Sequence, residues 1–286
     1  MENEYALKFI YTEAQKNRLS ELGLSADELQ KEFSTAIRRD MSFREAESKA
    51  VRENRMQLST LLHKTHKVAL AKLQEDLAAA LCAAGFTQVS TPTLVSAKAL
   101  EKMTITPENP LYEQVFWVDK KTALRPMLAP NLYEVSRQLM QSQGLPLRIF
   151  EIGSCFRKES EGRSHLKEFT MLNLVEWGTD PEQRNEVLKD FADLVMRTAG
   201  INDYLLENEN SVVYGDGLDI VTTDGLELAS TSMGPHPLDD AWKITCTWVG
   251  LGTGLERLLM HREKTVGIHR YSRSTVFLDG ACLKLK

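Results

Sequence analysis

The chain has 286 residues, 42% of them hydrophobic, which is enough to bury one large core and a small appended unit. Its four cysteines, Cys82, Cys155, Cys246 and Cys282, lie far apart and form no CxxC pair, which argues against a zinc site and favours a reduced setting. The N-terminus is acidic, and no stretch approaches the roughly 20 apolar residues of a membrane span, so we expect a cytoplasmic protein with no membrane partner.

The first part of the chain, residues 1–57, is predicted to be a helical subdomain. The segments that begin at Ser25 and Ser42 both have the Ser-x-x-Glu pattern of a capping box, and each predicts the start of a helix of about a dozen residues. The net charge of the chain is −5, yet basic residues gather at this end: Arg38, Arg39, Arg44, Lys49, Arg52, Arg55, His63, Lys64, His66 and Lys67. Interleaved acids leave two interpretations open, a solvated helix face and a nucleic-acid surface.

A long amphipathic helix is predicted from about Ser59 to Ala84. Its apolar residues recur at helical spacing: Leu61, Leu62, Val68, Leu70, Leu73, Leu77 and Leu81. Gly85 is expected to cap its C-terminus. A strand from Phe86 to Thr91 and then Pro92 follow. Packing within the monomer is the more common meaning of such a helix.

The remaining residues, 58–286, are predicted to form one domain in which short strands alternate with helices. Strands are expected at Gln114–Val118, Leu147–Phe156, Phe169–Trp177, Ser211–Tyr214, Leu218–Val221 and Trp242–Leu251, and helices at Pro130–Gln143, Pro181–Ala199 and Thr253–Arg262. Because several strands follow each other as hairpin-like neighbours, we expect antiparallel pairing. The expected class is α+β, an antiparallel sheet flanked by helices with an N-terminal helical subdomain.

Two segments carry the chemistry. FRKESEGRSHLKEF, from Phe156 to Phe169, places Arg157 where a strand enters a charged loop, and its two-pronged guanidinium suits a phosphate. GLGTGLERLL, from Gly250 to Leu259, has a glycine-rich turn followed by Arg257 near the start of a helix. Each segment alone is a weak signal, because exposed strand ends and helix caps give the same patterns. Their order and spacing favour a nucleotide site.

Together the two segments resemble motifs 2 and 3 of class II aminoacyl-tRNA synthetases. FTMLNLVEWG at 169–178 and VVYGD at 212–216 narrow the resemblance to the pyrrolysyl-tRNA synthetase family, in the form that its catalytic part has in bacteria. The resemblance implies a class II synthetase fold, in which the helix, strand and Pro92 correspond to motif 1. It further implies that pyrrolysine is activated with ATP to the aminoacyl-adenylate, with release of pyrophosphate, and transferred to the 3′ end of tRNA(Pyl).

The resemblance implies two catalytic arginines in an ATP site. Arg157 would contact the α-phosphate, and Arg257 would lie against the adenine and reach the γ-phosphate. The other expected ATP-binding residues are Glu159, His165, Leu166, Phe169, Glu227, Leu228 and Ser230. Glu227 and Ser230 also offer the hard oxygen ligands that suit Mg²⁺. Without the family, Glu227 is an ordinary carboxylate at a strand end and Phe169 an ordinary core residue.

The resemblance also implies an apolar pocket for the amino acid. Its expected residues are Leu128, Ala129, Leu132, Tyr133, Met171, Asn173, Val175, Tyr214, Ser232, Trp248 and Gly250. The Asn173 amide can donate to the side-chain carbonyl of pyrrolysine or another Nε-acylated lysine, a group that lysine lacks. Archaeal members have cysteine, valine and threonine where this chain has Val175, Ser232 and Gly217, so the pocket is expected to differ in shape.

The partners implied by the resemblance are tRNA(Pyl), a second copy of the chain in a homodimer, and a small separate protein. That protein would supply in trans the tRNA-binding domain that archaeal members carry at their N-terminus. Two alternatives stay open: a synthetase-like paralogue that binds without catalysis, and a class II enzyme or amide ligase for another acid, such as a phenylalanine-like substrate. Loss of Arg157, Arg257 or Glu227 would have favoured the paralogue, but all three are present.

Overall fold

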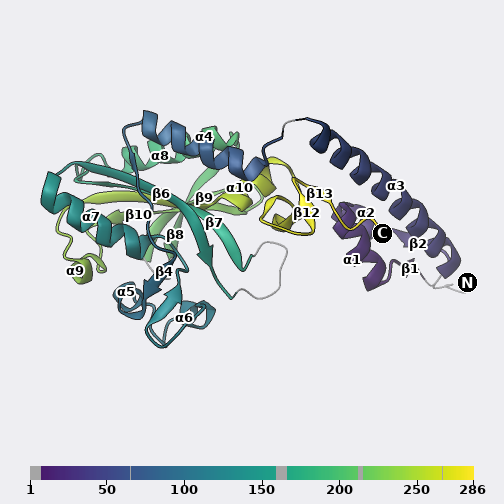
Figure 1. Cartoon of the computed structure of the whole chain (residues 1–286), viewed down its shortest axis with the longest axis horizontal. Helices are drawn as coiled ribbons and strands as arrows, with labels where there is room; N and C mark the ends of the chain where they lie inside the picture. The colour runs from purple at the N-terminus through teal and green to yellow at the C-terminus, as the bar shows by residue number, and fades with distance from the viewer. Residues whose placement is uncertain (1–7, 65, 159–165, 212–214, 266) are drawn as a thin grey trace, which may run out of the picture. The chain divides into compact units, whose positions relative to one another are not determined.

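A computed structural model of the chain describes residues 8–64, 66–158, 166–211, 215–265 and 267–286 (Figure 1). Of residues 208–211 and 215–217 only the backbone is described. The chain divides into two compact units, one of Met1–Ala69 with Glu263–Lys286 and one of Leu70–Arg262. Among the described helices, none combines the length and the apolar character that a membrane crossing needs.

The first unit is built on helices. Its elements are β1 (Phe9–Ile10), α1 (Glu13–Leu22), α2 (Ala26–Leu29), β2 (Glu32–Phe33), α3 (Ala36–His63), the 3₁₀ helix η1 (Ile268–Tyr271), β12 (Phe277–Leu278) and β13 (Ala281–Cys282). The capping box predicted at Ser25 is confirmed, although the helix that it opens has only four residues. The one predicted at Ser42 is wrong, because Ser42 lies inside α3, whose N-terminus is capped by the Thr35 hydroxyl.

A buried asparagine joins the two ends of the chain within this unit. The Asn54 side chain donates through Nδ2 to the carbonyl oxygens of Leu22 and Ala50, at 2.9 and 2.8 Å. Its Oδ1 accepts from the backbone N–H of Cys282 at 2.6 Å. The C-terminal strand β13 is thereby held to α1 and α3. The predicted boundary between residues 57 and 58 falls inside α3, and a functional division there stays a prediction.

The long helix predicted from Ser59 to Ala84 is wrong, because two helices occupy this stretch. Helix α3 ends at His63, the next residue has an extended backbone, and α4 spans Ala69–Ala83. The break is stabilised from far along the chain: Asp279 Oδ1 accepts from the Ala69 N–H at 2.8 Å, and Asp279 Oδ2 lies 2.7 Å from His66 Nε2. A distant carboxylate thus satisfies an N–H at the start of α4.

The apolar stripe holds only within α4. Leu70, Leu73, Leu77 and Leu81 are buried, whereas Leu62 in the preceding helix is 73% exposed. Gly85, predicted as the cap, has φ +86°, and the N–H groups around it return to the last turn of the helix. The predicted cap is confirmed.

The second unit is organised around a seven-stranded sheet in the described residues, in the order β3-β6-β7-β11-β10-β9-β8. Its strands are β3 (Thr87–Gln88), β6 (Leu147–Phe156), β7 (Glu168–Trp177), β8 (Leu205–Ser211), β9 (Gly215–Val221), β10 (Glu227–Gly234) and β11 (Trp248–Gly254). Neighbours pair antiparallel, except that β3 runs parallel to β6. The predicted α+β class with an antiparallel sheet flanked by helices is confirmed.

Helices and a small two-stranded sheet surround this large sheet. They are β4 (Leu94–Ser96), α5 (Ala97–Lys102), α6 (Pro110–Gln114), β5 (Thr122–Leu124), α7 (Ala129–Gln143), α8 (Arg184–Ala199), α9 (Asp239–Trp242) and α10 (Leu255–Arg262). Helices α4 and α8 run along the same side of the sheet in Figure 1, and Phe86 after α4 packs edge-on against Phe191 of α8 at 5.3 Å.

Four predicted strands differ from the structure or extend beyond it. The one predicted at Ser211–Tyr214 shares only Ser211 with β8, and its other residues lie outside the described part of the chain. The segment predicted as Gln114–Val118 instead follows α6 and contributes only the isolated bridge of Trp117 to Ala123. The strand predicted from Trp242 begins at Trp248, because α9 and a turn with Lys243 at φ +58° come first. The strand predicted to begin at Phe86 is reduced to the two residues of β3. Strand β10, rich in small polar residues, was not predicted.

We expect Leu77→Ala to lower the free energy of unfolding by roughly 2 to 5 kcal/mol, because it empties a fully buried site under α4. Lys72→Ala, on the exposed face of the same helix, is the control and should change it by no more than about 0.5 kcal/mol. Urea unfolding of both variants checks this. Equal destabilisation by the two changes would contradict the packing of α4.

Candidate functional site

Three neighbouring strands bring predicted site residues into rows. Asn173 on β7 pairs with Gly252 on β11, which pairs with Ser230 on β10. Two residues further along β7, Val175 pairs with Gly250, which pairs with Ser232. Side chains in register on adjacent antiparallel strands point to the same face. The two rows therefore lie side by side on one face of the sheet.

Two glycines of β11, Gly250 and Gly252, lie very close to their neighbours. A Cβ at Gly252 would lie 2.9 Å from Asn173 Nδ2, and one at Gly250 would lie 3.2 Å from the carbonyl oxygen of Leu174. Strand β11 thus contributes backbone and no side chain between its neighbours at these positions. This arrangement lets a ligand lie close to the sheet backbone.

Arg157 lies at one end of this face, directly after β6. Its Nε donates to the carbonyl oxygen of Pro126 at 3.0 Å, and its backbone N–H donates to the carbonyl oxygen of Lys167. Its guanidinium carbon lies 5.3 Å from the centroid of the Phe169 ring. A cation and an aromatic face are therefore held together beside the sheet.

Arg257, near the start of α10, contacts Glu227 of β10, which in turn contacts Ser230. Its Nη1 donates to the backbone carbonyl of Glu227 at 3.0 Å and lies 3.4 Å from Glu227 Oε1. The Ser230 hydroxyl donates to the same Oε1 at 3.2 Å. The Glu227 side chain is 46% exposed, so this pair adds little to stability, but it places a cation, a carboxylate and a hydroxyl together.

A buried glutamate next to Arg257 ties α10 to β7. Both carboxylate oxygens of Glu256, which is 1% exposed, accept from the backbone N–H of Thr170 at 2.9 Å. Thr170 immediately follows Phe169. One buried contact thus links the helix that carries Arg257 to the strand that carries the aromatic ring beside Arg157.

Aromatic residues form the other end of the site. Tyr133 on α7 stacks on Trp242, with ring centroids 5.3 Å apart, and packs edge-on against Trp177 and Trp248. The buried carboxylate of Asp239 accepts from the Tyr133 hydroxyl at 3.1 Å and from Trp248 Nε1 at 2.9 Å. Two polar groups that would otherwise be buried unpaired are satisfied by one side chain.

Asn173 presents an unsatisfied acceptor between these two ends. Its Oδ1 is buried, and no donor within the described part of the chain bonds to it. An unsatisfied buried group of this kind costs about 1 to 3 kcal/mol, so a ligand that bonds to it gains affinity. An amide can also turn over and present its N–H₂ group. Asn173 is therefore the polar recognition point in an apolar surrounding.

Comparison with known proteins places this geometry in a family. Residues 58–219 match the family model described as "Phenylalanyl tRNA synthetase beta chain CLM domain". The crystal structure of pyrrolysyl-tRNA synthetase from Desulfitobacterium hafniense is 49% identical, with a TM-score of 0.91, and the alignment covers 97% of this chain and 99% of that one. A second structure, of Desulfitobacterium hafniense PylSc, is 48% identical with a TM-score of 0.92 and 99% coverage of both chains. The chain belongs to the pyrrolysyl-tRNA synthetase family.

More distant relatives are other tRNA ligases. A threonine--tRNA ligase of Wolbachia sp. subsp. Drosophila simulans (strain wRi) is 31% identical over 149 residues, which is 49% of this chain and 23% of that protein. The one from Wolbachia pipientis subsp. Culex pipiens (strain wPip) is 30% identical over 141 residues, or 46% and 21%. The matches thus span less than a quarter of those ligases. The predicted membership of a class II synthetase family is confirmed.

The structure gathers most of the predicted amino-acid site of this synthetase in one hydrophobic cluster. Met171 is partly buried against the cluster, which contains Leu128, Ala129, Leu132, Tyr133, Val175 and Trp248. Ser232 lies on β10 beside it and is 9% exposed. Leu166 and Leu228 are also buried. Glu159, His165 and Tyr214 lie outside the described residues, and the individual roles of all these residues stay predictions.

The described residues contain no metal-binding cluster, and the thiol next to Arg157 is buried. Within the described ranges, no group of three or more His, Cys, Asp or Glu side chains could hold a metal ion. Burial raises the pKa of the Cys155 thiol to about 12, so this thiol next to Arg157 stays protonated near neutral pH and is not a nucleophile.

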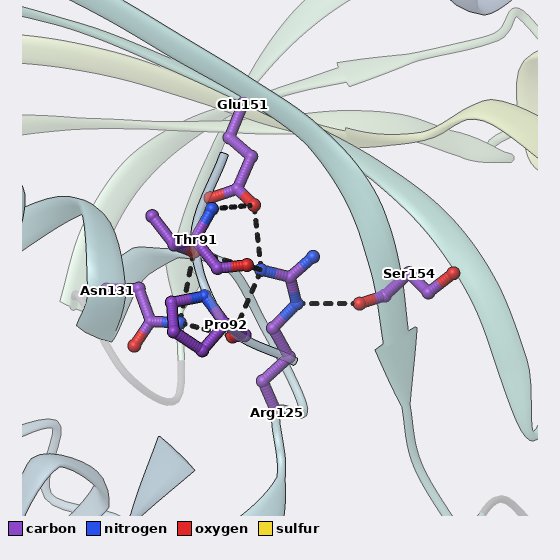
Figure 2. Close-up of polar contacts among 6 residues, drawn as sticks. All are labelled: Thr91, Pro92, Arg125, Asn131, Glu151 and Ser154. Atoms are coloured by element: carbon purple, nitrogen blue, oxygen red, sulfur yellow. Dashed lines mark hydrogen bonds and ion pairs between the residues drawn. The ribbon is translucent and has the colours of Figure 1, made fainter. Parts of the chain in front are cut away.

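Several residues that build the site were not predicted from the sequence. Asp239 and Glu256 look like ordinary surface acids there, since nothing in LDDAW or LERLL shows that their carboxylates are buried. Arg125, which precedes Pro126 in the sequence, and Glu151 form a buried ion pair (Figure 2). A signal existed for Glu151, because a lone acid inside the apolar strand LRIFEIG is seldom buried without a partner.

We expect Asp239→Ala to destabilise the fold by about 2 kcal/mol or more, because it leaves the Tyr133 hydroxyl and Trp248 Nε1 buried without an acceptor. Asp240→Ala, at the exposed neighbouring position, is the control and should behave like the unmodified chain. Thermal unfolding and the near-ultraviolet circular dichroism of the aromatic cluster measure the effect. An Asp239→Ala spectrum and midpoint equal to those of the control would contradict it.

Proposed function

We propose that the chain is a pyrrolysine–tRNA(Pyl) ligase that uses ATP to form pyrrolysyl-adenylate and then transfers the amino acid to the 3′ end of tRNA(Pyl). The observation that carries this proposal is the near-complete coverage by a pyrrolysyl-tRNA synthetase at 49% identity. The site supports it, because cationic groups lie beside one end of a sheet face whose other end is aromatic and buried.

The cationic end suits ATP. In adenylate formation a substrate carboxylate attacks the α-phosphorus and expels pyrophosphate, so the main requirements are positioning and neutralisation of charge. Arg157 would stabilise the charge on the α-phosphate, since its planar guanidinium can donate to two oxygens. Arg257 would neutralise the phosphates that leave, and Phe169 offers an aromatic face for the base. Glu159 and His165, in the segment of sequence after Arg157, are proposed to contribute as well.

Glu227 and Ser230 fit a magnesium ion that accompanies ATP. Their oxygens are 3.2 Å apart, and the Glu227 side chain is about half exposed, so both can reach an ion that takes its other ligands from phosphates and water. When bound, Mg²⁺ would supply positive charge to the leaving pyrophosphate. Arg257 would keep the Glu227 carboxylate in place.

The apolar end suits a long side chain that ends in a ring. The aromatic residues around Tyr133 leave Asn173 as the polar partner for the carbonyl of an acylated lysine nitrogen. Free lysine would have to lose the hydration of its ammonium group, and the Asp239 carboxylate at this end already accepts hydrogen bonds from Tyr133 and Trp248. The enzyme would therefore select its amino acid by the acyl carbonyl and not by the length of the amino-acid side chain alone.

The proposed macromolecular partners are tRNA(Pyl), a second copy of the chain, and a small tRNA-binding protein that acts in trans. Support for the tRNA comes from α3, where the exposed basic residues are Arg38, Arg44, Lys49, Arg52 and Arg55. Such a row supplies the salt-dependent attraction that a phosphate backbone requires. The homodimer and the separate protein rest on the family resemblance.

We expect Arg157→Ala to reduce ATP–pyrophosphate exchange by on the order of 10²- to 10³-fold, because it removes a charge-assisted contact made chiefly in the transition state. Arg197→Ala, on the surface of α8 with a side chain that is 74% exposed, is the control and should retain full activity. Circular dichroism would establish that both variants are folded. A folded Arg157→Ala protein with near-normal exchange would refute the assignment.

A second expectation concerns substrate choice. Pyrophosphate exchange with pyrrolysine, an Nε-acylated lysine, lysine and phenylalanine should show that the acylated forms are preferred over lysine by about tenfold or more, a difference of about 1.4 kcal/mol. Asn173→Ala should reduce the preference for acylated lysines over phenylalanine. The reduction should be larger when a bulky pocket residue is also replaced by a smaller one. Gln138→Ala removes an exposed amide of α7 and is the control.

Three outcomes of this assay would count against the proposal. Equal activation of lysine and its acylated form, or an unchanged ranking in Asn173→Ala, would contradict the role of Asn173. If pyrophosphate exchange occurs only with another amino acid, such as phenylalanine, that amino acid and not pyrrolysine is the substrate. A folded chain that supports no exchange would favour a paralogue that binds without catalysis.

A further inference from the structure

An ion pair is buried behind the predicted phosphate-binding arginine. Arg125 Nη1 lies 2.8 Å from Glu151 Oε1, and the two side chains are only 4% and 2% exposed. Charges taken out of water are tolerated only when the geometry is good and the remaining hydrogen-bonding groups are satisfied. Figure 2 shows the groups that Arg125 and Glu151 contact and so hold in place.

Glu151 fixes the segment that precedes β4. Its Oε1 also accepts from the Thr91 N–H at 3.0 Å, and its Oε2 accepts from the Thr91 hydroxyl at 2.7 Å. Asn131 of α7 donates to the same hydroxyl and to the Pro92 carbonyl oxygen. Glu151 lies on β6, so the carboxylate joins this segment to the central sheet.

Arg125 adds contacts that a lysine could not make together. Its Nε donates to the Ser154 carbonyl oxygen at 2.7 Å, while Nη1 donates to Glu151 and to Thr91. Gly153 makes the space, because a Cβ there would lie 2.1 Å from Arg125 Nη2. The guanidinium is thus held against β6.

The backbone carbonyl groups of Arg125 and Pro126 connect the buried pair to Arg157 through two hydrogen bonds. The Arg125 carbonyl oxygen accepts from the Phe156 N–H at 2.9 Å, and the Pro126 carbonyl oxygen accepts from Arg157 Nε at 3.0 Å. The side chain of Arg125 is anchored on β6 and its backbone holds the end of the same strand. The bond from Pro126 then restrains the Arg157 guanidinium.

We propose that Arg125 and Glu151 are positioning residues for Arg157: the buried pair sets the place of the Pro126 carbonyl, which in turn aims the Arg157 guanidinium. This inference rests on the proposed function, in which Arg157 contacts the α-phosphate. A misplacement of about 1 Å at such a group costs up to roughly 100-fold in rate. Loss of the pair should therefore reduce turnover beyond its effect on folding.

Arg125→Lys keeps the charge and loses the forked geometry, and Glu151→Gln keeps an acceptor and loses the charge. The matched control is Arg148→Lys, which changes the same residue type near the other end of β6, where Arg148 Nε lies 2.7 Å from Glu176 Oε2. ATP–pyrophosphate exchange is measured with an Nε-acylated lysine, well below the unfolding midpoint of each variant, and expressed per folded molecule.

We expect Arg125→Lys to lower kcat by about 10- to 100-fold with little change in KM for ATP, Glu151→Gln to act in the same direction, and Arg148→Lys to stay within about twofold. In an Arg157→Ala background the Arg125→Lys change should lose most of its effect on kcat, because both act through one group. An unchanged kcat per folded molecule, or a full effect in the Arg157→Ala background, would overturn the inference.

A readout without turnover decides the inference even if the chain activates no amino acid. In protein with ¹⁵N-labelled arginine, the Nε–H resonance of Arg157 is assigned by its absence in Arg157→Ala. We expect it to be protected from hydrogen exchange in the unmodified chain and in Arg148→Lys, and to lose protection in Arg125→Lys. Equal protection from hydrogen exchange in all three proteins would overturn the inference. If Arg125→Lys loses protection as expected but the unmodified chain shows no ATP–pyrophosphate exchange, only the proposed function is overturned.

Discussion

The antiparallel ladder of β7, β11 and β10 sets the distances on which the site depends. From Trp248 to Thr253 each residue of β11 faces one partner on either side, and Gly250 and Gly252 leave room that a Cβ would take up. A shift of one residue in this register would turn Asn173 and Ser230 to the opposite face. Because α10 follows β11 directly, the same register also fixes where the helix that carries Arg257 begins.

The ladder does not by itself hold the arginines. Glu256 fastens α10 to β7 through Thr170, and the pair of Arg125 and Glu151 fastens the segment around Pro126 to β6. Both carboxylates are almost fully buried and hydrogen-bonded, Glu256 by the Thr170 N–H and Glu151 by Arg125 and Thr91, which is the condition under which a buried charge is tolerated. The exposed charges of the site are thus supported by buried charges one layer behind them.

Local patterns in the sequence were sufficient for β6, β7 and α7 and for recognising the functional motifs. The bounds of β6 agree with the prediction, and those of β7 and α7 differ by a single residue, because each combines an apolar period with a clear stop signal such as Gly144 or Gly178. The break between α3 and α4 was not predictable, since the group that stabilises it, Asp279, lies 210 residues away along the chain. The same holds for the bond between Asn54 and Cys282. Arg157, Arg257 and Glu227 follow from their motifs, whereas Asp239 becomes visible only when the fold brings it to Tyr133 and Trp248.

The two ends of the site follow different physical rules. Near Glu227 and Arg257 the side chains are partly exposed, so they contribute little to stability and are available to bind charge. Near Tyr133 and Asp239 the groups are buried, so any change there affects the packing of the whole unit as well as the ligand. Asn173 lies between these regions, and its buried Oδ1 accepts no hydrogen bond from the described residues, an arrangement that costs free energy. A fold that accepts this cost at one position gains selectivity there, because a ligand that supplies the missing partner is favoured over one of the same size that does not.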